Sequence, residues 1–442
     1  MSPHPGKSAS SMAPATARLA TTITPPRRPL HGKVVLPGSK SITNRALLLA
    51  ALAEGTSRLS GALKSDDTAL MAAALRNMGV LIVEPDETSF VVTGTGRLAP
   101  PNEPLALGNA GTATRFLTAA ASLADGEVVI DGDAHMRKRP IAPLVAALRR
   151  LGVNATATAG CPPVLVRGRT GFAGGRVEVD GRLSSQYVSA LLMIGACGRG
   201  PVEVVLTYPD LDARGYVDLT LAAMAAFGAE TEAIGIAGWR VEPTGYRAAD
   251  VVVEPDASAA TYLWAAEVLT GGTIDLGFAP GASSQPDARA HAVIRTFPHL
   301  PAVIDGSQMQ DAVPTLAVLA AFNATPVRFT GIANLRVKEC DRVAALATEL
   351  SRIAPGLGLQ DGDDLVVVAG PALAATARPA RIETYADHRI AMSFALAGLM
   401  LEGIVILDPG CVSKTYPGYW ADLASLGIDI CKEFTSAAQP HL

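Results

Sequence analysis

The sequence lacks the features that mark several common classes of protein. It has five cysteines and no C-x-x-C pair, so neither a disulfide framework nor a zinc site is indicated. Its seven histidines include no H-E-x-x-H spacing, which leaves a metal centre without support. We therefore expect no metal, and we expect a reducing compartment, the cytoplasm, as the location of the protein.

Long apolar runs and an excess of positive charge are also missing. The longest apolar stretches, at 187–197 and 390–401, are shorter than the ~18 residues that a membrane-spanning helix needs. Lysine and arginine number 37 against 41 acidic residues, whereas nucleic-acid binding requires a basic surface. The chain has 442 residues, of which 49% are hydrophobic, so we expect large hydrophobic cores. We also expect a soluble protein that binds neither membranes nor nucleic acids.

The beginning of the chain has its own composition. Residues 1–28 are rich in Ser, Ala, Thr and Pro, and no acidic residue occurs before Glu54. This composition is compatible with an organelle transit peptide, but it has no apolar core of the kind found in secretory signals. Low apolar periodicity favours the simpler interpretation, and we predict a disordered N-terminal tail over residues 1–28.

An internal repeat is the most informative feature present. Six segments share a polar opening, an Ala/Leu-rich helical run, usually a Gly-containing turn and a strand-like Val/Ile run. They begin near Ser39, Gly111, Ser184, Asp256, Asp311 and Asp387. The intervals between successive starts are nearly equal, except that the fourth unit, which runs from Asp256 to Asp311, is clearly shorter. Chance similarity among Ala-rich helices is the alternative to a true repeat.

The length of the repeat predicts the architecture. A period of about 70 residues is too long for a solenoid unit and fits a βαβαββ-like module in which a second helix follows the first. Single cores stop growing beyond ~250–300 residues, so six modules cannot share one core. We therefore predict two lobes of three modules each, with the fourth module shortened by about 17 residues.

Chemistry-bearing residues gather at the predicted starts of these helices. Helix N-termini attract anions, although a Ser or Asp there is by itself an ordinary N-cap. A cation in a first turn opposes the helix dipole at a cost of about 0.3–1 kcal/mol, so it needs another reason to be there. An anionic ligand in a shared cleft supplies that reason, and acidic residues are then expected elsewhere. The five cations expected in first turns are Lys40, Arg139, Lys338, Arg389 and Lys414.

Seven stretches between about Lys33 and Leu426 carry a resemblance to a known family. They are LPGSKSITNRALLLAALAEG, LGNAGTATRFL, KRPI, DGRLSSQY, NLRVKECDR, YADHRIAMSF and DPGCVSKTYPGY. In this order and spacing they resemble the 5-enolpyruvylshikimate-3-phosphate synthases, or 3-phosphoshikimate 1-carboxyvinyltransferases. The resemblance implies an α/β (α+β) fold, an inside-out barrel of two lobes with three βαβαββ units each. Lobe 1 is expected to hold residues 29–38 and 256–442, and lobe 2 is expected to hold residues 39–255.

The resemblance implies transfer of the enolpyruvyl group of phosphoenolpyruvate to the 5-hydroxyl of shikimate 3-phosphate, with release of phosphate. The resemblance places this step in the shikimate pathway, which leads to chorismate and the aromatic amino acids, and implies that no metal or organic cofactor is needed. Two phosphates and two carboxylates repel strongly at ~4 Å in a water-poor site, so several cations are required.

Site residues follow from the same resemblance. Phosphoenolpyruvate is expected to contact Lys40, Gly111, Arg139, Gln186, Arg342, Arg389 and Lys414. Shikimate 3-phosphate is expected to contact Lys40, Ser41, Arg45, Ser184, Ser185, Gln186, Tyr216, Asp311, Asn334 and Lys338. Addition followed by elimination requires groups that exchange protons, for which Asp311 and Glu339 are candidates, with Lys40 as proton carrier or electrostatic stabiliser.

The chain departs from the family's usual pattern at a few places. Ala213 stands where Ser is usual, and Phe116 where Pro is frequent. The family's Q-G-D reads Gln285–Pro286–Asp287, and its Pro-Asp reads Gln310–Asp311. Altered kinetics or a related acceptor therefore stay open.

Two other functions also stay open. One is the enolpyruvyl transferase that acts on a UDP-sugar and shares the six-module fold, and the other is a catalytically inactive paralogue that binds anionic metabolites. The resemblance favours a monomer. Because Gly111 is retained, we also predict inhibition by glyphosate, which mimics phosphoenolpyruvate in this family.

Overall fold

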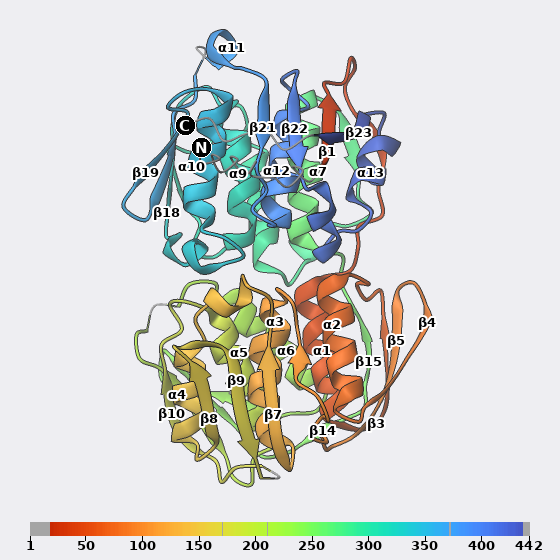
Figure 1. The fold of residues 1–442 in the computed structure, drawn as a ribbon, viewed down its shortest axis with the longest axis vertical. Coiled ribbons are helices and arrows are strands. Elements are labelled where there is room, and N and C mark those ends of the chain that lie inside the picture. Colours follow the sequence, from red (N-terminus) through yellow and green to blue (C-terminus); the bar gives the residue numbers. More distant parts are fainter. Residues whose placement is uncertain (1–17, 170, 210, 371–372, 436–442) are drawn as a thin grey trace, which may run out of the picture.

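The computed structural model describes residues 18–169, 171–209, 211–370 and 373–435. These residues form two lobes stacked along the long axis of the molecule (Figure 1). One hydrophobic core is drawn from residues between Ala46 and Val253, which we call lobe 2. The other, which we call lobe 1, is drawn from Ile23 to Leu36 and from Ala259 to Ile428. The predicted two-lobed α/β architecture is confirmed.

The three sheets of lobe 2 repeat one pattern, in which the first pair of strands is parallel and the following pairs are antiparallel. The first sheet contains β14 (Tyr246–Arg247) and β15 (Asp250–Val252), both beside β3 (Ala53–Ser60), then β5 (Ser89–Thr95) and β4 (Leu81–Asp86). The second has the order β6 (Leu105–Ala106), β7 (Gly126–Asp131), β9 (Cys161–Gly168) and β8 (Asn154–Thr158). The third has the order β10 (Gly175–Val179), β11 (Val202–Leu206), β13 (Gly238–Val241) and β12 (Thr231–Ala233).

Lobe 1 contains two sheets of the same pattern and one reduced sheet. The fifth unit has the order β17 (Val303–Asp305), β18 (Val327–Thr330), β20 (Asp364–Val367) and β19 (Gly358–Asp361). The sixth has the order β21 (Ala380–Ile382), β22 (Ile404–Leu407), β1 (Arg18–Thr24) and β23 (Asp429–Thr435). The fourth keeps only β16 (Thr273–Asp275) and β2 (His31–Lys33), so the shortening removes a strand pair from its sheet.

The prediction of a disordered tail over residues 1–28 is wrong for residues 18–24. This segment is β1, which pairs antiparallel with β22 on one side and with β23 on the other. Ala20, Thr21 and Ile23 are fully buried there. Its partners lie near the opposite end of the chain, so local periodicity could not reveal the pairing. Residues 1–17 of the predicted tail lie outside the described residues.

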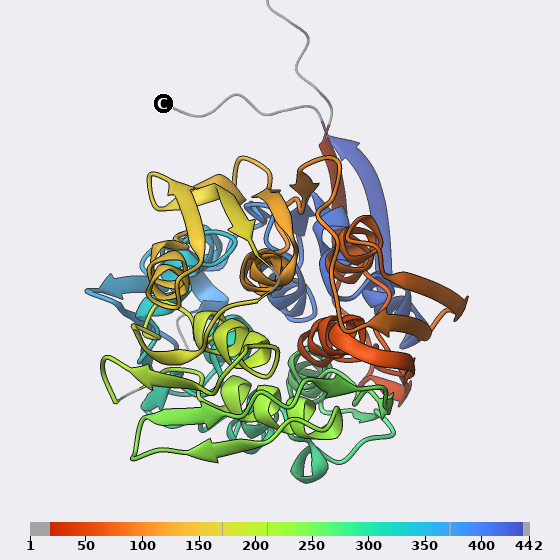
Figure 2. The same ribbon diagram turned by 90° about the horizontal axis from the view of Figure 1, so that it is seen from below.

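Six helices lie where the repeat predicts the first helix of each module, and they are the most buried elements. They are α1 (Lys40–Leu52), α3 (Gly111–Ala120), α5 (Ser185–Gly195), α7 (Ala257–Thr270), α9 (Val313–Ala320) and α12 (His388–Ala397). Every residue of α3, α9 and α12 is buried, including the polar residues Arg115 of α3 and Arg389 of α12. Viewed along the long axis, helices lie end-on inside the molecule with strands around them (Figure 2).

The second helices are more exposed, and short turns precede several of them. The second helices are α2 (Asp66–Asn77), α4 (Ala142–Arg150), α6 (Gly215–Ala226), α8 (Ala290–Ile294), α10 (Arg342–Ile353) and α13 (Tyr419–Ser425), and α11 (Leu373–Thr376) lies between modules. The 3₁₀ turns are η1 (Ala121–Leu123), η2 (Met136–Lys138), η3 (Pro280–Ala282), η4 (Pro286–Arg289), η5 (Gln310–Ala312), η6 (Ala333–Val337) and η7 (Pro409–Lys414). Within the described ranges no helix is long and apolar enough to cross a membrane.

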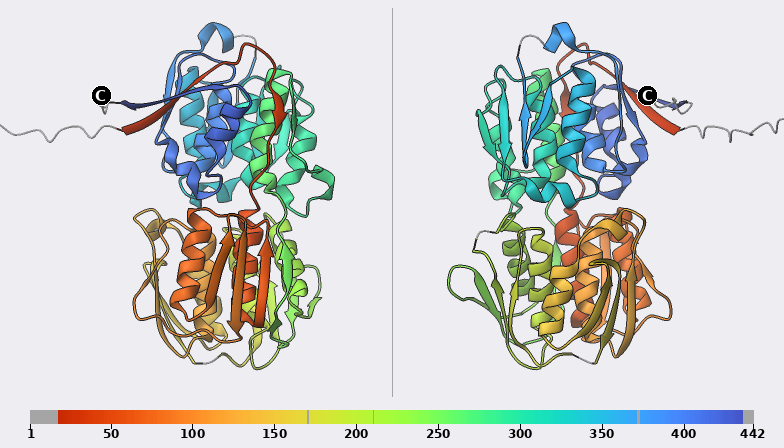
Figure 3. Two further views of the ribbon diagram at one scale, coloured as in Figure 1. Left: turned by 90° about the vertical axis from the view of Figure 1, so that its right-hand side faces the viewer. Right: turned by 60° about the vertical axis from the view of Figure 1, so that its left-hand side comes forward.

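The two segments that connect the lobes run side by side (Figure 3). Ser39 N donates to Glu254 O at 2.8 Å, and Asp256 N donates to Pro37 O at 2.8 Å. Between them stands Gly38, where a Cβ atom would lie 1.9 Å from the carbonyl oxygen of Gly61. We therefore propose the domain boundaries at residues 38–39 and 255–256.

Candidate active site

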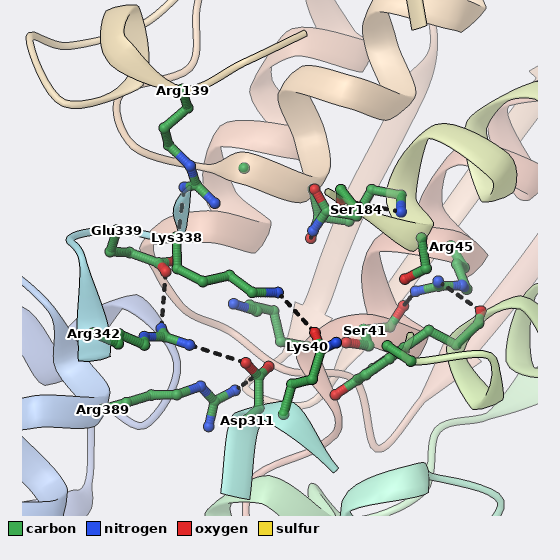
Figure 4. A pocket seen from close by; sticks show the side chains of 17 residues that line it. Lys40, Ser41, Arg45, Arg139, Ser184, Asp311, Lys338, Glu339, Arg342 and Arg389 are labelled. Carbon is green, nitrogen blue, oxygen red and sulfur yellow. Dashed lines mark hydrogen bonds and ion pairs between the residues drawn. The ribbon is translucent and has the colours of Figure 1, made fainter. Parts of the chain in front are cut away.

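A polar pocket lies between the lobes and is lined by side chains from both (Figure 4). Lobe 2 contributes Lys40, Ser41, Arg45, Gly111, Thr112, Arg139, Ser184, Ser185, Gln186, Ala213 and Tyr216. Lobe 1 contributes Gln310, Asp311, Lys338, Glu339, Arg342 and Arg389. The structure thus brings together all the residues that the resemblance implies, except Lys414 and Asn334.

Lys414 and Asn334 lie beside the pocket. Lys414 Nζ donates to Asp67 Oδ1 at 2.7 Å and to the carbonyl oxygen of Asn109 at 2.6 Å. Its Nζ is also 3.9 Å from Glu339 Oε1, which does line the pocket. Asn334 is buried, and its Nδ2 donates to Asp212 Oδ2 at 3.3 Å. Both residues are contacts between the lobes in this conformation.

The expectation that five cations stand in first helical turns is correct for Lys40 and Arg389 and wrong for the other three. Lys40 starts α1, and Arg389 is the second residue of α12. Arg139 follows η2 in extended conformation, as is usual for a residue before proline, and α4 begins three residues later. Lys338 follows η6, four residues before α10 begins, and Lys414 is the last residue of η7, which precedes α13. The helix dipole therefore acts on fewer of these cations than expected.

The lobe 1 face of the pocket is a buried network of ion pairs around Arg342. Its Nε donates to Asp387 Oδ2 at 2.8 Å, and its Nη2 donates to Glu339 Oε2 at 2.8 Å. Its Nη1 donates to Asp311 Oδ1 at 3.0 Å, and Arg389 Nη2 donates to the other Asp311 oxygen at 2.7 Å. Acidic residues were expected away from the cations, and this expectation is wrong because buried cations need counter-charges.

These contacts set the protonation of the two candidate proton carriers. Burial alone would raise the pKa of Asp311, but the charges of Arg389 and Lys338 outweigh it and hold the pKa well below its usual range. Burial is likewise outweighed at Glu339, where Arg342 and Arg139 hold the pKa well below its usual range. Burial lowers the pKa of the Lys338 ammonium. Both carboxyl groups are therefore ionised at neutral pH.

The lobe 2 face holds its cations with fewer counter-charges. Arg45 is 2% exposed, and within the described part of the chain no carboxylate pairs with it. Its guanidinium donates to Thr220 Oγ1, Ser189 Oγ and two backbone carbonyls. The guanidinium also lies 5.2 Å from the centre of the Phe116 ring, a cation–π distance. Burial lowers the pKa of Arg45 to about 10, so it stays a cation at neutral pH.

The other two lobe 2 cations have partial partners. Lys40 Nζ lies 3.4 Å from Asp67 Oδ2. Arg139 Nη1 donates to Asn109 Oδ1 at 3.2 Å and lies 3.9 Å from Glu339 Oε1 across the pocket. A Cβ atom on Gly111 would lie 2.9 Å from the Arg139 guanidinium nitrogens, so glycine leaves room for that side chain.

Sequence reasoning missed the carboxylates that hold these cations. Asp67 is the second residue of α2 and bridges Lys40 and Lys414, yet nothing near it in the sequence marks it as a partner of either. Asp387 was identified only as a helix opening, although its side chain holds Arg342 and caps α12. The available signal was electrostatic, because a set of buried cations in a chain of net charge −4 requires nearby acidic groups.

The departures from the family pattern lie in or near the pocket. Ala213 has a φ of 55° and lines the pocket with a methyl group. Gln310 accepts from Lys338 Nζ at 3.4 Å, so a hydrogen-bonding group stands there. Pro286 begins η4, next to Asp287. The Phe116 ring supports Arg45, as described above.

Comparison with known proteins shows which protein family the chain matches. The family model described as EPSP synthase (3-phosphoshikimate 1-carboxyvinyltransferase) matches residues 24–296 and 281–423. A 3-phosphoshikimate 1-carboxyvinyltransferase of Rhizobium leguminosarum bv. trifolii is 68% identical over 93% of this chain and 98% of its own length. One from Pseudomonas syringae pv. syringae is 66% identical over 92% of this chain and 98% of its own length.

Solved structures agree in fold. EPSP synthase from Acinetobacter baumannii has a TM-score of 0.76 at 26% identity and covers 95% of this chain and 100% of its own. The enolpyruvyl transferase NikO from Streptomyces tendae, with a TM-score of 0.72 at 20% identity over 95% of this chain and 100% of its own, shares the fold. The match of sequence over nearly the whole chain leads to one conclusion: this chain belongs to the EPSP synthase family.

Proposed function

We propose that the protein transfers the enolpyruvyl group of phosphoenolpyruvate to the 5-hydroxyl of shikimate 3-phosphate and releases phosphate. Family membership at 68% identity supports this reaction, and the intact charged set of the pocket supports it independently. It is a step of the shikimate pathway towards chorismate and the aromatic amino acids.

The observation that carries the proposal is the convergence of six cations on one pocket. Lys40, Arg45, Arg139, Lys338, Arg342 and Arg389 line it together, and Lys414 stands behind Glu339. Asp67, Asp311 and Glu339 neutralise part of this positive charge, and the charge that remains attracts anionic ligands. Two substrates that bring two phosphates and two carboxylates supply those anions.

The residues divide between the substrates as the resemblance implies. Phosphoenolpyruvate would be held by Lys40, Gly111, Arg139, Gln186, Arg342, Arg389 and Lys414, which come from both lobes. Shikimate 3-phosphate would be held by Lys40, Ser41, Arg45, Ser184, Ser185, Gln186, Tyr216, Asp311, Asn334 and Lys338, mostly on the lobe 2 face. The phosphoenolpyruvate site needs the lobes together, so closure would exclude water at the reacting carbon.

Proton transfer would use Asp311 and Glu339. Asp311 would accept the proton of the attacking hydroxyl, and Glu339 with Lys40 would serve the methylene carbon of phosphoenolpyruvate. Asp311 is a weak base while it faces two arginines at hydrogen-bond distance. Anionic substrates that share the charge of Arg342 and Arg389 raise the pKa of Asp311, so binding prepares it as a base.

The test is phosphate release from purified protein. Release is expected only when phosphoenolpyruvate and shikimate 3-phosphate are both present. Release with a UDP-sugar in place of shikimate 3-phosphate would assign the related transferase activity instead. Binding of both anions without release would indicate an inactive paralogue.

Sedimentation velocity with and without substrates tests the proposed monomer, and fractionation of the source cells tests the proposed cytoplasmic location.

A further inference from the structure

Asp287 is a buried carboxylate that the proposed reaction does not use. It lies in η4 of lobe 1 and is 1% exposed. Its Oδ2 accepts from the Tyr216 hydroxyl at 2.8 Å and from Ser258 Oγ at 2.5 Å. Its Oδ1 is buried without a hydrogen-bond partner among the described residues. Within that part of the chain, the carboxylate thus meets two neutral hydroxyl donors and no cation at hydrogen-bond distance.

Tyr216, in contrast, lines the pocket and belongs to lobe 2. Its carbonyl oxygen accepts from Arg45 Nη2 at 2.9 Å, and its hydroxyl reaches Asp287 in the other lobe. Tyr216 is therefore held at two points. Arg45, which the proposed function assigns to shikimate 3-phosphate, binds its backbone carbonyl, and Asp287 binds the hydroxyl at the tip of its ring. The hydroxyl contact exists only when the lobes are together.

The surroundings of this contact are a seam between the lobes. Ala213 N donates to Ser307 O at 2.7 Å, and Arg214 N donates to Gln308 Oε1 at 3.1 Å. A Cβ atom on Gly215 would lie 2.8 Å from Pro286 Cβ, so the start of α6 packs closely on the start of η4. Proline fixes the backbone before Asp287, and the packing leaves little freedom in where its carboxylate stands.

The electrostatics of Asp287 argue against a role in stability. Tyr216 faces it from α6, Ser258 from α7, Asp311 from η5 and Arg389 from α12. Burial first and the charge of Asp311 second raise its pKa to about 6. A buried carboxylate with a raised pKa costs free energy at neutral pH compared with a neutral residue of the same shape. Since Asp287 does not add to stability, its role is explained by the hydroxyl groups that it binds.

We propose that Asp287 is a positioning residue for the acceptor substrate, because it orients the Tyr216 ring on the acceptor side of the pocket across the lobe interface. The proposal rests on the proposed function, since it assigns Tyr216 to shikimate 3-phosphate. It ties acceptor affinity to lobe closure through one hydrogen bond. Phosphoenolpyruvate, which faces the arginines, is held independently of this bond.

The experiment compares KM for the two substrates in substituted proteins. Asp287→Ala is expected to raise KM for shikimate 3-phosphate about ten-fold, the effect of one hydrogen bond to a charged group. KM for phosphoenolpyruvate is expected to change less than about three-fold. Tyr216→Phe, which removes only the hydroxyl, is expected to reproduce this split, and the double variant is expected to be no worse than either single one.

Two further variants separate positioning from general structure. Asp287→Asn keeps an oxygen that can accept from both hydroxyls, so it is expected to retain KM for the acceptor within about three-fold. Glu349 is a second buried carboxylate of lobe 1 with a tyrosine hydroxyl, that of Tyr385, at 2.6 Å and with a pKa raised chiefly by burial. It does not line the pocket, and Glu349→Gln is expected to leave both KM values unchanged.

The outcomes are distinct from those that test the reaction itself. If the unsubstituted protein releases no phosphate with the two substrates, the proposed function fails first. If it is active and Tyr216→Phe leaves the acceptor KM unchanged, or raises both KM values equally, the positioning role is overturned and the reaction stands. Tyr216→Phe keeps this test available even if Asp287→Ala does not fold.

Discussion

The two faces of the pocket hold their charges in opposite ways. On the lobe 1 face, Arg342 is saturated by three carboxylates at 2.8 to 3.0 Å. On the lobe 2 face, Arg45 is equally buried but meets only hydroxyls, carbonyls and the Phe116 ring among the described residues. One face is neutralised from within, and the other keeps a cation whose charge only a ligand can balance.

This difference separates two tasks that a binding site must perform. A saturated network fixes geometry, because removing any one of its carboxylates leaves part of the buried positive charge without a counter-charge. A buried cation that no carboxylate of the protein neutralises attracts an anionic ligand, because the ligand forms the charge-assisted hydrogen bonds that the protein does not provide. We expect lobe 1 to supply rigid catalytic geometry and lobe 2 to supply acceptor affinity, and the following experiments test that division.

Asp311→Ala is expected to have the largest effect. It removes the proposed base and takes one carboxylate partner from each of Arg342 and Arg389, so kcat should fall by about 10²- to 10⁴-fold while some substrate binding is retained. Steady-state kinetics and equilibrium binding measure the two parts. Asp361→Ala is the matched control, because Asp361 is an exposed aspartate of lobe 1 paired with Arg328. Near-normal turnover in Asp311→Ala would remove Asp311 from its role.

Asp387→Ala tests the rigidity of lobe 1. It removes the carboxylate that pairs with the Arg342 Nε and caps α12, so the free energy of unfolding should fall by about 3–5 kcal/mol. Denaturant unfolding measures this change. An unfolding free energy close to that of the unsubstituted protein would mean that the network does not stabilise lobe 1.

Arg45→Met tests the opposite expectation for lobe 2. The guanidinium has no carboxylate partner in the described residues, so a neutral side chain of similar length leaves no buried charge unpaired, and the unfolding free energy should fall by no more than about 1–3 kcal/mol, the cost of the carbonyls that lose their donor. KM for shikimate 3-phosphate should rise about ten- to a hundred-fold, the effect of a charge-assisted hydrogen bond. A larger loss of stability without loss of acceptor affinity would reverse the division between the lobes.

Gly111→Ala is expected to have the smallest effect and concerns the junction of the two faces. The unsubstituted protein should be inhibited by glyphosate, because Gly111 leaves space beside Arg139. A methyl group there would displace the guanidinium, which lies 2.9 Å from it, and should weaken glyphosate inhibition by about ten-fold or less. Inhibition constants measured against phosphoenolpyruvate test this, and uninhibited turnover of the unsubstituted protein at saturating glyphosate would contradict it.

Much of the fold could be predicted because it repeats. The Ala/Leu runs after Ser39, Gly111 and Ser184 recur at a nearly constant interval, and the shortened interval after Asp256 matches the two-stranded sheet of β16 and β2. Strand β1 was missed because its partners are distant in the sequence, and pairing between distant strands leaves no local periodicity to detect.

The sequence predicts which cations belong to the site. It predicts only in part where each cation stands relative to the start of its helix. A cation before a helical run has the same sequence signature whether it stands in the first turn, as Lys40 does, or in a preceding 3₁₀ turn, as Lys414 does. The roles of the buried carboxylates are harder to predict from the sequence. Asp67 and Asp287 meet their partners only after the lobes are assembled, so their roles belong to tertiary structure.

The position of β1 has a consequence for how the protein is made. The core of lobe 2 is drawn from one continuous stretch of chain, between Ala46 and Val253, and we expect this stretch to fold as a unit during synthesis. Strand β1 emerges earlier, but its neighbours β22 and β23 are synthesised only after all of lobe 2. At about 5–20 residues per second, β1 waits for roughly 20–80 s without its partners. The sixth sheet of lobe 1 is therefore expected to form only after the whole of lobe 2 has been synthesised.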